Sequence, residues 1–266
     1  MNHRTLNGVV AALAGMLTTM LTTTAQALVT LPAGDIFLDG SLEFLYAESG
    51  SARIDPALYI DSNTTFGPGA LAEVYAPPGD VTAATGLGFD YGYADAGSAT
   101  LRIAYTIRND TAATWTGLRF LADVSGDPFD VPIEVASVHG AAATAGDPQA
   151  WGIDDFFTGD LFVNDVLGIG QLDNGNGCGG AACAAEGALQ WNLASLAPGE
   201  RWIITVLLSD AGVTNASRWL EFALDAGGPT GAVLSFSGAA VVVPLPAAAW
   251  LLAGGIPLLR ARRRVR

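Results

Sequence analysis

One stretch decides the fold class of this chain: Thr100-Leu101-Arg102-Ile103-Ala104-Tyr105-Thr106-Ile107. Its apolar residues at positions 101, 103, 105 and 107 alternate with smaller or more polar ones. A period of two puts alternate side chains on opposite faces of an extended chain, which is the pattern of a half-buried β-strand. The turn-forming residues Asn109-Asp110-Thr111 follow directly. We therefore expect a strand, then a turn, then a partner strand.

The same alternation recurs towards the C-terminus, without a sustained helical pattern. In Leu196-Ala197-Pro198-Gly199-Glu200, Pro and Gly occupy the central positions of a type II turn, which predicts a hairpin between the flanking strands. Short strands joined by polar turns predict an all-β protein, an antiparallel β-sandwich of immunoglobulin-like or jelly-roll-like type. Further strands are expected at 115–124, 189–193, 202–208, 220–224 and 233–236.

Three tryptophans fall in these predicted strands: Trp115, Trp191 and Trp202. The simplest interpretation is packing in the core or across strands, because an indole ring buries a large apolar area. Stacking of one of these rings on a sugar is the alternative.

The N-terminal end has the layout of a secretory signal peptide. Arg4 precedes an apolar run at 9–21, and Ala25-Gln26-Ala27 is a small-x-small site, which predicts cleavage between Ala27 and Leu28. The sequence thus divides into a helical signal peptide at 1–27, one exported acidic β-sandwich domain at 28–238, and a sorting and anchor segment at 239–266.

The C-terminal segment contains Val243-Pro244-Leu245-Pro246-Ala247, an apolar run and a terminal cluster of arginines. The two prolines hold the chain extended, and a hydrophobic helix is expected after them. As a helix, residues 247–259 span about 20 Å, which is short for a bilayer core of about 30 Å. Counting from residue 239 gives a sufficient length only if the membrane tolerates both prolines. The arginines are expected to stay in the cytoplasm, which places the preceding domain outside.

The residues Val243 to Ala247 resemble the C-terminal sorting signal PEP-CTERM, in its VPLPA-CTERM variant. The resemblance implies that the segment is a temporary membrane anchor, cut near this motif by an exosortase-type enzyme. A permanent C-terminal anchor is the alternative.

Charge excludes one class of partner. All 26 acidic residues lie between Asp35 and Asp225, a region that holds only six of the 12 basic residues, and the chain has no lysine. A field of this sign repels nucleic acid and favours solubility outside the cell. Nucleic-acid binding is therefore not expected.

Cys178 and Cys183 are the only cysteines. In an exported bacterial domain they are expected to form a disulfide, because that compartment is oxidising. A zinc site is the alternative, but it needs two further Cys or His ligands, and the predicted domain offers only His139.

The segment from Trp151 to Cys178 is rich in Asp and Asn. Its oxygen ligands suit Ca²⁺ outside the cell, although Asp173-Asn174-Gly175-Asn176-Gly177 lacks the spacing of an EF-hand. The alternative is that these residues form surface turns. Four stretches also resemble parts of uncharacterised exported PEP-CTERM proteins, a resemblance that implies no established activity: Ile153-Asp154-Asp155, Gly159-Asp160-Leu161, Leu172-Asp173-Asn174-Gly175-Asn176, and Leu189 to Gly199. The candidate Ca²⁺ ligands are Asp154, Asp155, Asp160, Asp173, Asn174 and Asn176.

No nucleophile–base pair or cofactor motif stands out, so catalytic residues and a resident cofactor are not predicted. The favoured function is that of a structural or interaction protein at the cell surface or in the extracellular matrix, associated with exopolysaccharide or biofilm. We expect it to cross the inner membrane and to be anchored there transiently, with an exosortase-type enzyme as its processing partner. The alternatives are a Ca²⁺-dependent or carbohydrate-binding module and, less favoured, a secreted hydrolase.

Overall fold

The structure is a computed structural model, and it describes residues 41–46, 50–60, 78–94, 100–126, 133–140, 146–155, 171–179, 183–209, 218–224 and 233–244. Several residues singled out in the sequence lie outside these ranges. They are the signal-cleavage residues Ala25, Ala27 and Leu28, the candidate ligand Asp160, and Leu245, Pro246 and Ala247 of the sorting motif.

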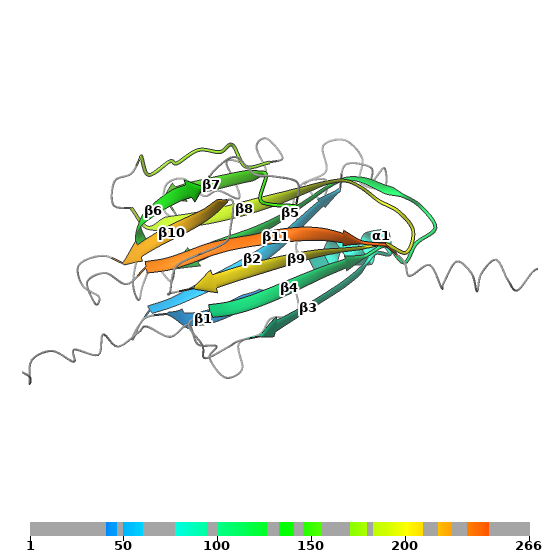
Figure 1. The fold of residues 1–266 in the computed structure, drawn as a ribbon, viewed down its shortest axis with the longest axis horizontal. Helices are drawn as coiled ribbons and strands as arrows, with labels where there is room; N and C mark the ends of the chain where they lie inside the picture. The colour runs from blue at the N-terminus through cyan, green and yellow to red at the C-terminus, as the bar shows by residue number, and fades with distance from the viewer. Residues whose placement is uncertain are drawn as a thin grey trace, which may run out of the picture.

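Two antiparallel sheets make up the described part of the chain (Figure 1). The five-stranded sheet has the order β1-β2-β5-β8-β7, and the six-stranded sheet has the order β3-β4-β9-β11-β10-β6. The prediction of an all-β antiparallel sandwich is confirmed. The strands are β1 (Leu42–Tyr46), β2 (Gly50–Ile60), β3 (Gly88–Ala94), β4 (Thr100–Arg108), β5 (Trp115–Gly126), β6 (Ile133–Gly140), β7 (Ala150–Asp155), β8 (Ala185–Leu196), β9 (Arg201–Ser209), β10 (Arg218–Leu224) and β11 (Val233–Val243), and a short helix α1 (Pro78–Thr85) precedes β3.

The stretch that decided the fold class is β4. Leu101, Ile103, Tyr105 and Ile107 are buried, and the residues between them are exposed or half-buried. The alternation therefore reports one face on the core and one face on the surface. Every other strand expected from the sequence overlaps a strand of the structure.

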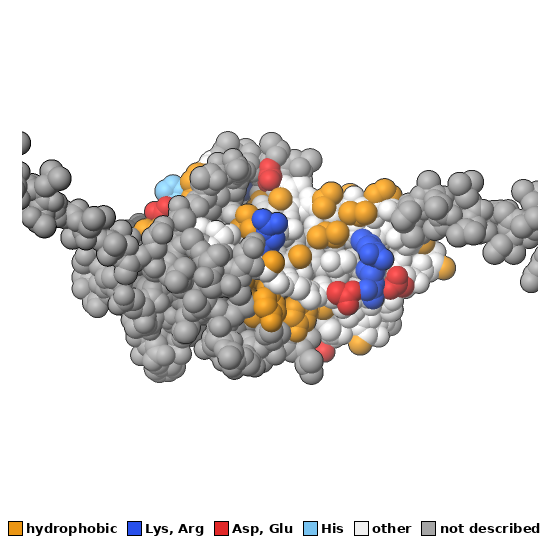
Figure 2. Space-filling view, turned by 60° about the horizontal axis from the view of Figure 1, so that its bottom comes forward, with side chains coloured by type: hydrophobic (Ala, Val, Ile, Leu, Met, Phe, Trp, Pro, Cys, Tyr) orange, Lys and Arg blue, Asp and Glu red, His pale blue; other side chains and the backbone are white. Residues whose placement is uncertain are grey.

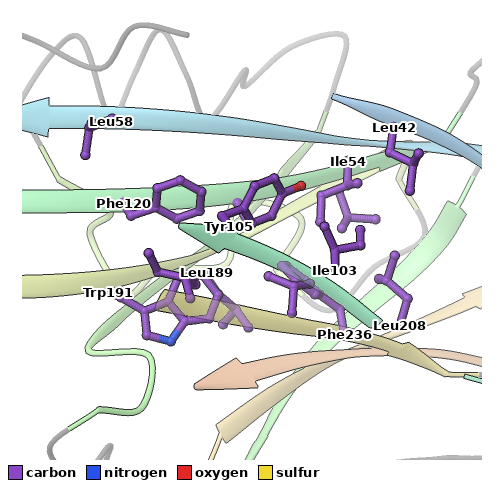
Figure 3. Close-up of a cluster of buried hydrophobic side chains, with 14 of the residues drawn as sticks. Leu42, Ile54, Leu58, Ile103, Tyr105, Phe120, Leu189, Trp191, Leu208 and Phe236 are labelled. Atoms are coloured by element: carbon purple, nitrogen blue, oxygen red, sulfur yellow. The ribbon is translucent and has the colours of Figure 1, made fainter. Parts of the chain in front are cut away.

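Aromatic side chains from both sheets meet in one core (Figure 3). The ring of Phe120 on β5 lies 5.1 Å from that of Tyr105 on β4 and 6.4 Å from that of Trp202 on β9, centroid to centroid. Trp191 is 1% exposed and Trp202 is 2% exposed. The interpretation of these two tryptophans as core residues is therefore confirmed. Trp115 is half-buried and packs at the edge of the same core.

Two pairing predictions were wrong. Pro198 and Gly199 do form a turn, in which Glu200 N–H donates to Ala197 O at 3.0 Å and Gly199 has a φ of 81°. However, β8 and β9 belong to different sheets, so this turn is not a hairpin. The same holds for β4 and β5, which were expected to pair. Both turns instead carry the chain from one sheet to the other.

Strand β11 runs past Gly238, where the predicted domain ended, and continues to Val243. Residues 239–243 pair with β9, and the last pair is Val243 with Arg201. The first five residues assigned to the tail segment are therefore part of the six-stranded sheet.

Candidate functional site

Most of the predicted Ca²⁺ ligands gather at the edge of the five-stranded sheet. Asp154 and Asp155 end β7, and Asn176 forms a parallel bridge with Ile153 of that strand. Asp173 and Asn174 precede this bridge in the same described segment. The structure thus brings together five of the six predicted residues, since Asp160 lies outside the described ranges.

Three oxygens of these side chains accept backbone hydrogen bonds, one from strand β7 across to Asn174 and two within the local chain. Asn174 Oδ1 accepts from Trp151 N–H at 3.2 Å, Asp154 Oδ1 accepts from Asp155 N–H at 2.9 Å, and Asp173 Oδ1 accepts from Gly175 N–H at 2.5 Å. Within the described ranges, no group of three or more His, Cys, Asp or Glu residues is placed to hold a metal ion. The turn-forming role of these residues is therefore visible, and Ca²⁺ binding stays a prediction.

Sequence reasoning missed a carboxylate next to this set. Glu186 on β8 is 5% exposed and lies directly opposite Asp154 in the ladder between β7 and β8. Directly paired residues share one face of a sheet. The face is the outer one, because Ile153 and Leu189 of the same strands point into the core. Alternation around Leu189 in the sequence places residue 186 on this outer face, but only the strand register places it beside Asp154.

The predicted disulfide between Cys178 and Cys183 is confirmed, with the two Cα atoms 5.9 Å apart. Both cysteines are half-buried and pack against the main core. The bridge closes a short loop between the segment that holds Asn176 and the start of β8.

A second polar and aromatic cluster lies on the outer face of the six-stranded sheet, on strands β6 and β10. The rings of His139 and Trp219 stack with centroids 5.3 Å apart and an interplanar angle of 15°. Glu221 Oε2 lies 3.8 Å from His139 Nε2, and the side chains of His139 and Glu221 are each 38% exposed. Figure 2 shows a histidine beside acidic and hydrophobic side chains at this surface. We call His139, Trp219 and Glu221 the aromatic–acidic cluster.

The nearest strand position on the other side of Trp219 holds a serine. Ser237 on β11 pairs directly with Trp219, which itself pairs with His139. Neighbouring strands are about 4.8 Å apart, so Ser237 and His139 are separated by roughly 10 Å. This distance is too long for a nucleophile–base hydrogen bond. The backbone spacing therefore does not place Ser237 beside His139.

A cavity of about 280 Å³ opens at the side of the sandwich, between β8 and β11. Trp191 Nε1 is buried there, and among the described residues it has no hydrogen-bond partner. The tryptophan rings that line the cavity present almost no accessible surface, so it offers no open platform for a ligand. Its lining residues are Gly146, Asp147, Trp191, Asn192, Leu193, Trp202, Ala240, Val241 and Val242.

The predicted sorting motif begins inside the fold. Val243 is the last residue of β11, and Pro244 follows it as an exposed residue. The described part of the chain contains no helix with the length and apolar character needed to cross a membrane. No protein-family model, curated protein or solved structure matches this chain.

Proposed function

We propose that the protein is an exported surface or extracellular-matrix protein of structural or interaction type, processed by an exosortase-type enzyme and associated with exopolysaccharide or biofilm. It crosses the inner membrane, is held there transiently by its C-terminal segment, and reaches the cell surface or the medium. The observation that carries the proposal is the junction at Val243-Pro244. All described strands precede this junction, so cutting the tail beyond it leaves both sheets intact.

Charge and fold support the same role. A strongly acidic sandwich remains soluble and resists non-specific association outside the cell. The disulfide suits an oxidising compartment. Together with the two terminal signals predicted from the sequence, these features support a structural or interaction role outside the cell.

The test compares the protein in a parent strain and in a strain that lacks the exosortase-type enzyme. The parent should release a form whose C-terminus, determined by mass spectrometry, lies at or after Pro244. The mutant strain should retain a longer form in its membrane fraction. A form of the same mass and location in both strains would refute processing. Loss of the protein should in turn alter aggregation or biofilm, and unchanged surface behaviour would refute the matrix role.

The aromatic–acidic cluster favours a second candidate function, a carbohydrate-binding module. A partly exposed aromatic ring offers apolar surface to a pyranose, and a neighbouring carboxylate accepts hydrogen bonds from sugar hydroxyls. His139, Trp219 and Glu221 supply these groups within one small area. The strong negative charge of the domain favours a neutral sugar over an anionic one.

Affinity electrophoresis through the cell's own exopolysaccharide tests this candidate. Wild-type protein should be retarded, and Trp219→Ala should migrate as it does without polysaccharide. Tyr93→Ala is the matched control, because Tyr93 is an exposed aromatic residue on β3, at the opposite edge of the same sheet. Equal retardation of all three proteins, or of none, would remove the cluster as a binding site.

The finer class of the sandwich, immunoglobulin-like or jelly-roll-like, is part of the proposal. The chain changes sheet between β2 and β3, between β4 and β5, between β5 and β6, between β6 and β7, and between β8 and β9. Repeated changes of sheet are a property of the Greek-key connections in both classes.

A further inference from the structure

A described segment of the chain occupies the open edge of β7, the last strand of the five-stranded sheet. Asn174 N–H donates to Trp151 O at 2.9 Å, and Gly177 N–H donates to Ile153 O at 2.8 Å. In the other direction, Ile153 N–H donates to Gly175 O at 3.1 Å, and Trp151 N–H donates to Asn174 Oδ1 at 3.2 Å. These bonds satisfy all the backbone groups that Trp151 and Ile153 turn away from β8. We call residues 172–177 the strap.

The strap is fastened at both ends. At its start, Leu172 is fully buried in a small apolar cluster with Leu121 and Ala188, on the outer face of the sheet. Its backbone N–H donates to Gln190 Oε1 at 3.1 Å. Directly after the strap, Cys178 forms the disulfide with Cys183, two residues before β8 begins. Apolar packing and one hydrogen bond therefore hold the first end of the strap, and a disulfide holds the chain directly after its last residue.

We infer that the strap is a redox-sensitive cover over a pairing edge, and that reduction of the disulfide admits a second copy of this chain to β7. A dithiol reductant supplies the two electrons: the S–S bond breaks, Cys178 and Cys183 become thiols, and the reductant becomes a cyclic disulfide. In the chain-entropy model, losing a disulfide across a loop this short raises the population of the open state roughly thirtyfold. An uncovered edge strand presents unpaired N–H and C=O groups, which is a template for pairing with another chain.

The pattern of outward groups favours a second copy as the partner. Antiparallel pairing about a two-fold axis at Gly152 places Trp151 of one copy opposite Ile153 of the other, in both directions. These are the two residues whose outward groups the strap now satisfies. The same register places Asp154 opposite Ala150 of the other copy, so the acidic residues do not face one another.

Such a dimer joins two five-stranded sheets into one continuous sheet. The inference deepens the proposed structural role, on which its biological meaning rests, by naming the partner as a second copy of the chain.

The experiment uses the full chain in mild detergent, oxidised and then reduced with dithiothreitol. Residue-resolved hydrogen exchange, measured at a dilution where the reduced protein is monomeric, should show the amides of Trp151 and Ile153 exchanging roughly thirtyfold faster after reduction. The amides of β4, which lie in the other sheet, should not change. Sedimentation velocity at increasing concentration should show a monomer when oxidised and a dimer when reduced. Unchanged exchange at Trp151 and Ile153, or a reduced protein that stays monomeric, would overturn the inference.

Variants separate the strap from general effects of the reductant. The double variant Cys178→Ser/Cys183→Ser should dimerise without reductant, and Leu172→Asp should do the same with the disulfide intact. Trp151→Pro removes one outward N–H, so its reduced form should remain monomeric, whereas Trp151→Leu, which keeps that N–H, should dimerise. Circular dichroism establishes that each variant is folded, and dimerisation of reduced, folded Trp151→Pro would also overturn the inference.

The cell-surface behaviour of a deletion strain tests the matrix role separately.

Discussion

The side-chain amide of Asn109 donates a hydrogen bond to the carbonyl oxygen of Leu196 at 2.8 Å, and this bond links the turn after β4 to the end of β8. The same Nδ2 group donates to Ala113 O at 2.7 Å, and Oδ1 accepts from the N–H of Thr111 at 3.1 Å. The backbone of Asn109 also exchanges hydrogen bonds with Gly199 and Glu200. One fully buried residue therefore links two of the turns at which the chain changes sheet, the one after β4 and the one after β8.

Replacement of this residue should be costly. Asn109→Asp keeps the shape but turns the Nδ2 donor into an acceptor facing two carbonyl oxygens, so we expect a loss of about 3 kcal/mol in the free energy of unfolding. Chemical denaturation at neutral pH measures the loss. Gln171→Ala is the control, because Gln171 is exposed, and it should change stability by less than about 0.5 kcal/mol. An Asn109→Asp protein as stable as this control would contradict the linking role.

Gly238 should not tolerate a side chain. A Cβ atom there would collide with Thr205 O and would lie 2.8 Å from Cζ2 of the buried Trp191. We expect Gly238→Ala to lower the free energy of unfolding by about 1–3 kcal/mol. Gly92→Ala is the matched control, since a Cβ at Gly92 on β3 meets nothing within 4 Å. Equal midpoints of thermal unfolding for the two variants would show that β9 and β11 adjust freely.

Gly146 contacts the part of β11 that extends beyond its pairing with β10, because its carbonyl oxygen accepts a hydrogen bond from Ala240 N–H. It has a φ of 92°, and a Cβ there would lie 2.7 Å from Ala240 O. Gly146→Ala should therefore combine backbone strain with a collision and cost about 2 kcal/mol or more. Gly179→Ala, at a φ of 61° but in open space, isolates the strain and should cost about 1 kcal/mol. Thermal unfolding of both variants measures the difference, and no difference would mean that the contact with Ala240 is dispensable.

Calcium binding at the edge of β7 is tested by thermal unfolding in EDTA and in excess Ca²⁺. If the ion binds Asp154 and its neighbours with a Kd one hundredth of its free concentration, it stabilises the folded state by about 2.7 kcal/mol. The midpoint should then rise with Ca²⁺, and the rise should disappear in Asp154→Asn. Asp90→Asn on β3, at the far side of the molecule's other sheet, should keep it. The same midpoint in EDTA and in Ca²⁺ would remove the ion from the description of this site.

The strands were predictable because alternation reports directly on burial. In β4 and β9, every second residue is buried, so a period of two in the sequence reveals both the strand and its inner face. Pairing was not predictable in the same way. Alternation states which side chains point inward, but it does not state whether the next strand lies beside this one or across the core. The turn at Pro198-Gly199 is compatible with both arrangements, and the structure has the second.

The candidate site was only partly predictable for a related reason. The grouping of Asp and Asn around 151–178 was visible in the sequence, whereas the position of Glu186 opposite Asp154 depends on the register between β7 and β8. Trp219 was missed, although its signal was present. Leu220 and Phe222 face the core, and Trp219 is one position before Leu220. Alternation therefore predicts that Trp219 lies on the outer face of the sheet.

The place of β11 in its sheet has a consequence for the order of assembly. This strand is made last among the described strands, yet it lies between β9 and β10 and contacts both. A chain delivered from its N-terminal side supplies β3, β4, β6 and β9 first and β10 next. Strand β11, which joins β9 to β10, arrives last. Until residues 233–243 emerge, β10 and β6 have no connection through the sheet to β9, β4 and β3. Completion of the six-stranded sheet thus coincides with the delivery of Val243, the first residue of the predicted sorting motif.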